Sequence, residues 1–291
     1  MNIVDYANYL EQLRKSHNTI MAYCKDVEMF EKYVITKGLT DLSEVTSTEV
    51  VAYLLKLANE GISSSTSSRK LSSLRTYYSF LVEKGLTHEN PCIGIKAPRT
   101  ERKDMEYLST DDIEKLLSVP DDSIKGLRDR AILEVLYATG IHISELLEMT
   151  LDDLNMRMGF VMCNGNHGKA RIIPFGKHAR GALQDYLKLS RPILVDDMDT
   201  QLLFVNINGD SLTRQGLWKI LKDYAQKAEL SVHITPQTLR NSFAVHMLQN
   251  GADLKSLQEL MGHEDISTTE AYLTVTKNRI KDVYDRTHPR A

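Results

Sequence analysis

Three side chains in the C-terminal part of the sequence are suited to chemistry: those of Arg240, His263 and Tyr272. A guanidinium can hold a phosphate through two parallel donors, an imidazole can move a proton near neutral pH, and a phenolic hydroxyl can act as a nucleophile. Each residue also has an ordinary structural interpretation, as a surface arginine, a histidine that caps a helix, or a tyrosine packed between helices. Taken singly, each favours the structural interpretation.

Several other kinds of active site are excluded by the absence of their motifs from the sequence. It contains no Walker loop, GxSxG elbow, HExxH pair or EF-hand loop. The three cysteines, Cys24, Cys92 and Cys163, are widely spaced and form no CxxC or Cys/His ligand pattern. We therefore expect no disulfide framework, no metal and no cofactor, and a reducing compartment, the cytoplasm.

The composition is that of an ordinary globular protein. The 291 residues are 42% hydrophobic and 26% charged, which predicts about two domains. No signal peptide is visible at the N-terminus, and no apolar run approaches the roughly 18 residues of a membrane helix, so no membrane partner is expected. The net charge of −3 gives no global indication of nucleic acid, although a local basic patch is compatible with it.

The first part of the chain, residues 1–96, is predicted to be a helical domain. Apolar residues recur at helical spacing over residues 5–15, 20–34, 50–59 and 69–82. The serine-rich run at residues 63–68 resembles a flexible linker, but it leads directly into the fourth periodic segment. We interpret it as the start of that helix. Residues 97–106, which include Pro98 and several charges, are the predicted domain linker.

The second domain, residues 107–291, is predicted to be helical with one β-hairpin. The hairpin consists of strands at residues 160–163 and 170–174 joined by a glycine- and asparagine-rich turn. Helices are expected at residues 111–117, 124–139, 144–149, 177–189, 213–229, 235–250, 254–261, 267–275 and 277–285. The predicted fold class is therefore mainly α with a small antiparallel β-sheet, in two domains.

Two segments of this domain carry a family resemblance. Residues 138–146 read ATGIHISEL, and residues 250–272 read NGADLKSLQELMGHEDISTTEAY. With Arg240 upstream, they resemble the boxes of the tyrosine recombinase, or integrase, family. The N-terminal domain resembles the SAM-like core-binding domain of the Xer subgroup. The similarity covers nearly the whole chain, and several motifs occur in the right order.

The resemblance implies two domains that clamp duplex DNA. In this family a tyrosine attacks the scissile phosphate to give a 3′-phosphotyrosyl intermediate, two arginines hold the phosphate, a hairpin lysine protonates the leaving 5′-oxygen, and two histidine-type residues assist. No metal is required. Matched residue by residue, the nucleophile is Tyr272, the second arginine is Arg240 and the later histidine is His263.

Other family positions are substituted. His142 stands at the first arginine, Gln237 at the earlier histidine, and Asn166 at the hairpin lysine, while Asn241 replaces the histidine that commonly follows the second arginine. Histidine cannot bind a phosphate through a two-donor fork, and amide side chains cannot supply a proton. The sequence therefore predicts impaired or absent strand cleavage. His167 or Lys169 in the same hairpin could substitute for the missing acid if the turn moved it into place.

DNA contacts are expected to survive better, because they are spread over many phosphates. Arg69, Lys70 and Arg75 lie in a stretch, residues 62–78, without any acidic residue. Lys169 and Arg171 on the hairpin are further candidates. The alternative for the first group is an ordinary solvated helix face.

Three hypotheses follow for function. The preferred one is a Xer-like DNA-binding protein impaired or inactive in cleavage, a pseudoenzyme. The second is an active recombinase with an altered site, and the third is a protein-interaction module without DNA binding. The resemblance implies double-stranded DNA as the partner, with a homotetramer or a hetero-assembly with an active Xer recombinase. It also implies activation by a septal DNA translocase in chromosome-dimer resolution. The last predicted helix could bind in cis or to a neighbouring copy.

Overall fold

The serine-rich run begins a helix in the computed structural model, as interpreted from the sequence. Ser63 is its N-cap, and the Ser63 hydroxyl accepts a hydrogen bond from the backbone N–H of Thr66 at 3.2 Å. Such a cap satisfies one of the backbone donors left over at a helix start. The structure describes residues 3–39, 41–99, 105–164, 170–196, 198–263 and 268–273. Contacts divide the chain into two compact units, Met1–Lys103 and Asp104–Ala291.

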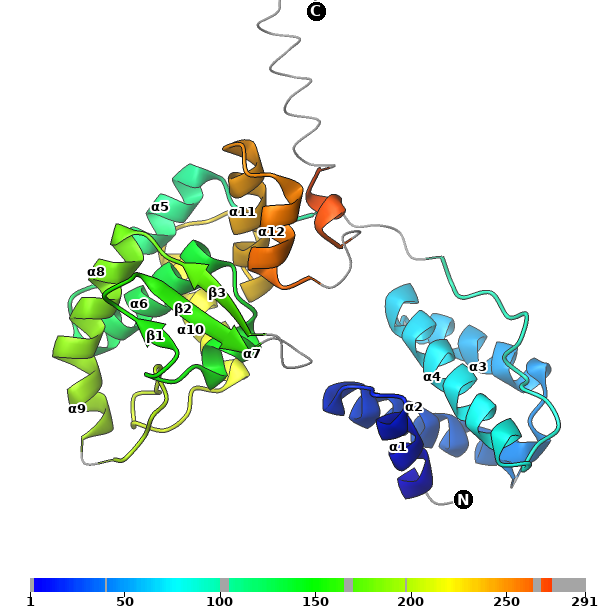
Figure 1. Ribbon diagram of the computed structural model, residues 1–291. Helices are drawn as coiled ribbons and strands as arrows, with labels where there is room; N and C mark the ends of the chain where they lie inside the picture. The colour runs from blue at the N-terminus through cyan, green and yellow to red at the C-terminus, as the bar shows by residue number, and fades with distance from the viewer. Residues whose placement is uncertain are drawn as a thin grey trace, which may run out of the picture. The chain divides into compact units, whose positions relative to one another are not determined.

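The first unit is a helical domain (Figure 1), and its core is rich in aromatic side chains. Tyr6, Phe30 and Tyr78 are completely buried. The phenol of Tyr6 donates to the carbonyl of Ser73, and that of Tyr78 to the carbonyl of Leu42, so both buried hydroxyls are hydrogen-bonded. Its elements are α1 (Ile3–Gln12), α2 (His17–Thr36), η1 (Leu42–Glu44), α3 (Ser47–Asn59) and α4 (Ser64–Glu83).

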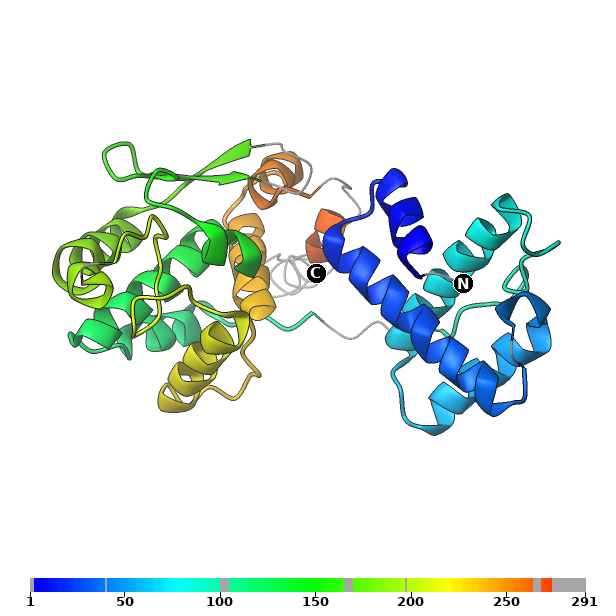
Figure 2. The same cartoon turned by 90° about the horizontal axis from the view of Figure 1, so that it is seen from below.

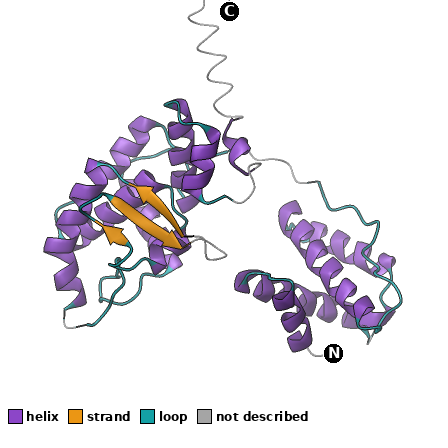
Figure 3. Cartoon of the chain, viewed as in Figure 1, coloured by secondary structure: helices purple, strands orange, loops and turns teal. Residues whose placement is uncertain are grey.

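The second unit is helical with one small sheet, which lies along one side of the helices (Figure 3). The strands pair antiparallel in the order β1-β2-β3, with Cys163 opposite Arg171. The predicted fold class is thus confirmed. The elements are α5 (Thr110–Ser118), α6 (Ile124–Thr139), α7 (Ile143–Glu148), β1 (Leu154–Asn155), β2 (Phe160–Asn164), β3 (Ala170–Pro174), α8 (Lys177–Asp185), η2 (Tyr186–Ser190), α9 (Arg191–Val195), α10 (Arg214–Lys227), α11 (Pro236–Gln249) and α12 (Leu254–Met261).

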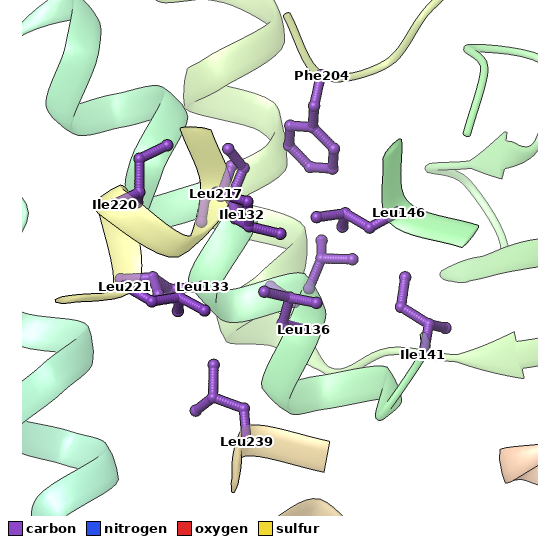
Figure 4. Packing of buried hydrophobic residues seen from close by; sticks show 14 of the residues in the cluster. Ile132, Leu133, Leu136, Ile141, Leu146, Phe204, Leu217, Ile220, Leu221 and Leu239 are labelled. Carbon is purple, nitrogen blue, oxygen red and sulfur yellow. The ribbon is translucent and has the colours of Figure 1, made fainter. Parts of the chain in front are cut away.

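Helix α6 runs through the centre of this unit and is buried along most of its length. Ile132 and Leu136 of α6 belong to the same buried cluster as Leu217 and Leu221 of α10 (Figure 4). The helix ends at Gly140, which has φ of 58°. A Cβ there would lie 2.3 Å from the ring of Phe243, so only glycine fits both the backbone and the space.

The structure differs from the prediction in one helix and adds one strand that was not predicted. The helix expected over residues 177–189 leaves α-geometry at Tyr186, passes through a π-helical turn, and resumes as α9, which ends at Val195. Pro192 is tolerated because it lies in the first turn of α9, where its missing N–H is not required. Strand β1 pairs with β2 but is only two residues long, too short to give a periodic signal.

Residues 268–273 are helical, in agreement with part of the expected helix at 267–275. The predicted helix at 277–285 and the hairpin turn lie outside the described residues. Among the helices described, none is both long and apolar enough to span a membrane. Figure 2 shows α11 and α12 of this unit from below, next to the segment at 268–273.

Candidate active site

Arg240 is the central buried cation of the second unit, with 2% of its surface exposed. It lies on α11, and its guanidinium donates to the carbonyl of Gly140 at the end of α6 and to that of Met261 at 2.6 Å. Within the described part of the chain, its Nε–H has no acceptor. Burial lowers the pKa of Arg240 to about 10, so it remains a cation at neutral pH. The side chain is therefore fixed and charged, and its Nε–H is available as a hydrogen-bond donor.

His263 follows the end of α12 and is held from both ring nitrogens. Its Nε2 lies 3.0 Å from Nη2 of Arg240, and its Nδ1 lies 2.8 Å from the hydroxyl of Thr269. Arginine can only donate, so Nε2 must be the acceptor and Nδ1 must carry the hydrogen. Burial and the charge of Arg240 lower the pKa of His263 to about 4. The imidazole is consequently neutral, with its tautomer set by Arg240.

Tyr272 lies beside these two residues. Its ring is nearly parallel to that of His263, with centroids 6.4 Å apart and an interplanar angle of 6°. The phenol is buried, with 3% of the residue exposed, and its hydroxyl donates to Oδ1 of Asn241 at 3.3 Å. Asn241 also accepts from Nε2 of Gln237 at 2.9 Å. The fold thus brings Arg240, His263 and Tyr272 together, with Gln237 connected through Asn241.

His142 is the N-cap residue of α7. Its backbone N–H donates to Oε2 of Glu145 at 2.8 Å. Desolvation and the charges of Arg240 and Arg171 lower the pKa of His142, against the opposing effect of Glu145. His142 is therefore a neutral imidazole at pH 7.

Arg171 on β3 makes internal contacts with two elements. Its guanidinium forms a two-donor ion pair with Glu145, at 2.5 and 2.8 Å, and its Nε donates to the carbonyl of Leu260 at 2.9 Å. Hydrogen bonds from Arg171 lower the pKa of Glu145 although burial opposes them. Arg171 therefore connects the hairpin to α7 and to the end of α12.

The cations expected to contact DNA from α4 occupy different environments. Lys70 is buried, and its Nζ lies 3.0 Å from the carboxylate of Asp26. Arg75 donates to backbone carbonyls of Cys92 and Ile95. Arg69 pairs with the same carboxylate of Asp26, but 43% of its side chain remains exposed. Of the three, Arg69 has the most exposed side chain, although its guanidinium is paired with Asp26 through two donors.

Asn166, His167 and Lys169 lie outside the described residues, so the structure places none of them. Glu145 and Thr269, by contrast, are site residues that the sequence analysis missed. For Glu145 a signal existed, because an acidic residue at the third position of a helix is the expected partner of the N-cap backbone. Thr269 gave no such signal, since its contact with His263 depends on how the chain returns after α12.

Family models match most of the chain. Residues 106–279 match the model described as the phage integrase family. Residues 3–85 match that of the phage integrase N-terminal SAM-like domain. The two matched segments fall one in each compact unit.

Curated relatives match along the full length. The chain is 44% identical to the tyrosine recombinase XerD of Listeria monocytogenes serotype 4b, over 99% of this chain and 99% of the relative. It is 40% identical to the tyrosine recombinase XerD of Oceanobacillus iheyensis, over 99% and 98% of the two chains.

Solved structures share the fold at lower identity. The XerH site-specific recombinase bound to its palindromic difH substrate gives a TM-score of 0.77 at 21% identity, covering 91% of this chain and 78% of that one. The Tn1549 transposon integrase in complex with transposon right-end DNA gives 0.76 at 20% identity, covering 99% of each chain. At this identity the likeness concerns the fold.

Proposed function

This chain belongs to the phage integrase family of tyrosine recombinases and is XerD-like. From that premise we propose, first, that it binds duplex DNA and, second, that it is impaired or inactive in strand cleavage. The environment of Arg240 is the observation that supports DNA binding. Arg240 is a charged, buried guanidinium whose Nε–H has no acceptor in the described part of the chain. An unmet buried donor is costly, and a phosphate oxygen would satisfy it with a charge-assisted hydrogen bond.

The substitution at His142 supports the second half of the proposal. A second arginine would add a two-donor grip on the phosphate and stabilise the charge that grows there during attack. His142 is kept neutral by desolvation and by Arg240 and Arg171. The charge of Arg171 cannot replace the missing one, because Glu145 already pairs with it.

The tautomer of His263 also supports impaired cleavage. Its Nε2 accepts from Arg240, and its hydrogen is on Nδ1, which is bonded to Thr269. In this arrangement Nε2 has no hydrogen to donate to a phosphate. A donor role for His263 therefore requires Arg240 to exchange its contact first.

Duplex DNA is proposed as the ligand on the same family premise. The XerH recombinase structure contains a difH substrate, and the Tn1549 integrase structure contains transposon right-end DNA. In this chain the side chain of Arg69 on α4 is 43% exposed, with its guanidinium paired to Asp26. A homotetramer, or a hetero-assembly with an active Xer recombinase, remains the expected form on DNA.

The alternative is an active recombinase with an altered site. It is favoured by the direct contacts among Arg240, His263 and Tyr272, which retain nucleophile, one arginine and one histidine in a single group. The two proposals differ in one observable, the covalent bond between Tyr272 and DNA.

The test uses nicked duplexes carrying Xer-like sites, which trap a covalent intermediate because the short leaving strand diffuses away. Native and denaturing gels are run with the wild type, Tyr272→Phe, and Tyr23→Phe as a control tyrosine in the other unit. We expect a native shift at low salt and little or no denaturation-resistant band. A strong band that disappears only in Tyr272→Phe would establish the active recombinase. No shift at low salt, where phosphate contacts are strongest, would leave an interaction module.

A further inference from the structure

The hydroxyl of Tyr272 is hydrogen-bonded to a residue to which the family chemistry described above gives no role. That residue is Asn241, the neighbour of Arg240 on α11, and its Oδ1 accepts from the phenol at 3.3 Å. Both side chains are buried, at 3% and 9% exposed. The partner of the nucleophilic oxygen is therefore an amide carbonyl in a site shielded from water.

The orientation of the Asn241 amide follows from its other contacts. Its Nδ2 donates to the backbone carbonyl of Glu106 at 2.9 Å, and its Oδ1 accepts from Nε2 of Gln237 at 2.9 Å. A flipped amide would set its oxygen against the carbonyl of Glu106, acceptor facing acceptor. The carbonyl side of Asn241 is thereby fixed toward Tyr272.

An oxygen that can only accept needs the phenolic hydrogen in order to bond. With the hydrogen removed, the phenolate oxygen would face Oδ1 with lone pairs on both sides, in a site where water cannot easily intervene. The contact therefore stabilises the protonated phenol over the phenolate. The nucleophile of the family reaction is the deprotonated or deprotonating form.

The ionisable groups that face Tyr272 do not reverse this preference. Burial raises the pKa of Tyr272, and Arg240 on α11 opposes that effect. His263, whose ring lies parallel to the phenol, is neutral and has both nitrogens engaged.

We propose that Asn241 is a positioning residue that holds Tyr272 in its buried, protonated form, so that the tyrosine must exchange Asn241 for another proton acceptor before it can attack. The inference rests on the proposed function for its meaning, but the hydrogen bond it concerns exists without DNA. Gln237 contributes by occupying the same carbonyl and fixing its direction.

The experiment measures the titration of Tyr272 in the full-length protein, without DNA. Tyrosine labelled with ¹³C at Cζ is followed by NMR from pH 7 to 12, and Tyr272→Phe assigns the signal. Asn241→Ala removes the acceptor and admits water, which can donate to a phenolate, so the pKa of Tyr272 should fall by about one unit. Asn241→Asp keeps an acceptor of the same shape and adds a negative charge, so the pKa should rise. Asn250→Ala, at the far end of α11, is the control and should leave it unchanged.

The opposite directions expected for the two variants distinguish this role from a merely structural one, which would change the pKa of Tyr272 in the same direction in both. A pKa of Tyr272 that stays or rises in Asn241→Ala, or that falls in Asn241→Asp, overturns the inference. Asn241→Asp has nearly the same shape, but its second oxygen replaces the donor to Glu106, so the fold of both variants is verified by circular dichroism. Each variant has its own expected direction, so either one that folds is sufficient to decide. The outcome is separate from the gel experiment above, since the titration can succeed where DNA binding fails, and the reverse.

Discussion

Arg171 and Arg240 donate hydrogen bonds to the carbonyl oxygens of two consecutive residues at the end of α12. Nε of Arg171 lies 2.9 Å from the carbonyl of Leu260, and Nη2 of Arg240 lies 2.6 Å from that of Met261. The C-terminal end of a helix carries unpaired carbonyls and a partial negative charge, so it is a suitable acceptor for two cations. One arginine comes from the hairpin and the other from α11.

Replacement of Arg171 should destabilise the second unit. The Arg171–Glu145 pair is largely buried, with 13% and 11% of the two side chains exposed. Arg171→Ala leaves the carboxylate of Glu145 without its main partner, which should lower the free energy of unfolding by about 3 kcal/mol. Arg171→Lys keeps the charge but not the two-donor fork and should lose about half as much. Urea denaturation measures both, and equal losses would contradict the role assigned to the fork.

Restoring an arginine at position 142 should raise strand cleavage. His142→Arg adds a permanent charge and a two-donor grip near Arg240, and a single preorganised donor of this kind is worth about 10²-fold or more in rate. Covalent trapping on nicked duplexes measures the gain. His142→Lys is the matched control, because it adds the charge without the fork and should give a smaller increase. An unchanged rate in His142→Arg would show that this position does not limit cleavage.

Stability should depend on the protonation of His263. Its pKa is about 4 in the folded protein and about 6.5 in an unfolded chain. Between these values the unfolded state binds the extra proton, so this contribution is complete above pH 6.5 and is lost as pH falls toward 4. It amounts to about 3 kcal/mol. Urea unfolding measured across that range should be less steep with pH in His263→Gln than in the wild type. His233→Gln, at an exposed position, should leave the slope unchanged.

Substitutions of the two neighbouring cations on α4 should have different effects. Lys70→Ala removes a buried partner of Asp26 and should destabilise the first unit by about 2 kcal/mol. Arg69→Ala removes a side chain that is 43% exposed. It should cost little stability and reduce the salt slope of DNA binding by about one. Urea melts and gel shifts at several salt concentrations measure the two effects. A reduced slope in a folded Lys70→Ala protein would contradict this division.

Helix caps and apolar periodicity were sufficient to predict much of the fold, and the family spacing of motifs predicted the central residues of the site. Ser63 is a small polar residue directly before a helical repeat, and that local pattern was sufficient to interpret the serine run correctly. Arg240, His263 and Tyr272 were selected by their order and spacing, and the fold brings them together.

Ion-pair partners that are distant in the sequence could not be predicted from local patterns. Lys70 was considered for DNA because its own segment has no acidic residue, yet Asp26 reaches it from α2. Arg171 was considered because it lies on the hairpin, and it instead pairs with Glu145. A charge without a local counter-charge looks free in the sequence, and only the packing of helices shows which ones are already paired.

The shared helix end has a consequence for the cooperativity of the site. The backbone N–H groups of Gly262 and His263 bond back to Glu259 and Gln258 in the last turn of α12. Helix ends are the places where local unfolding costs least. Fraying of that single turn would remove one hydrogen bond from each of Arg171 and Arg240 and displace His263 in the same event, while Glu145 and the carbonyl of Gly140 still hold the two arginines. Amide hydrogen exchange at Gly262 and His263 therefore reports how often this end of the site opens.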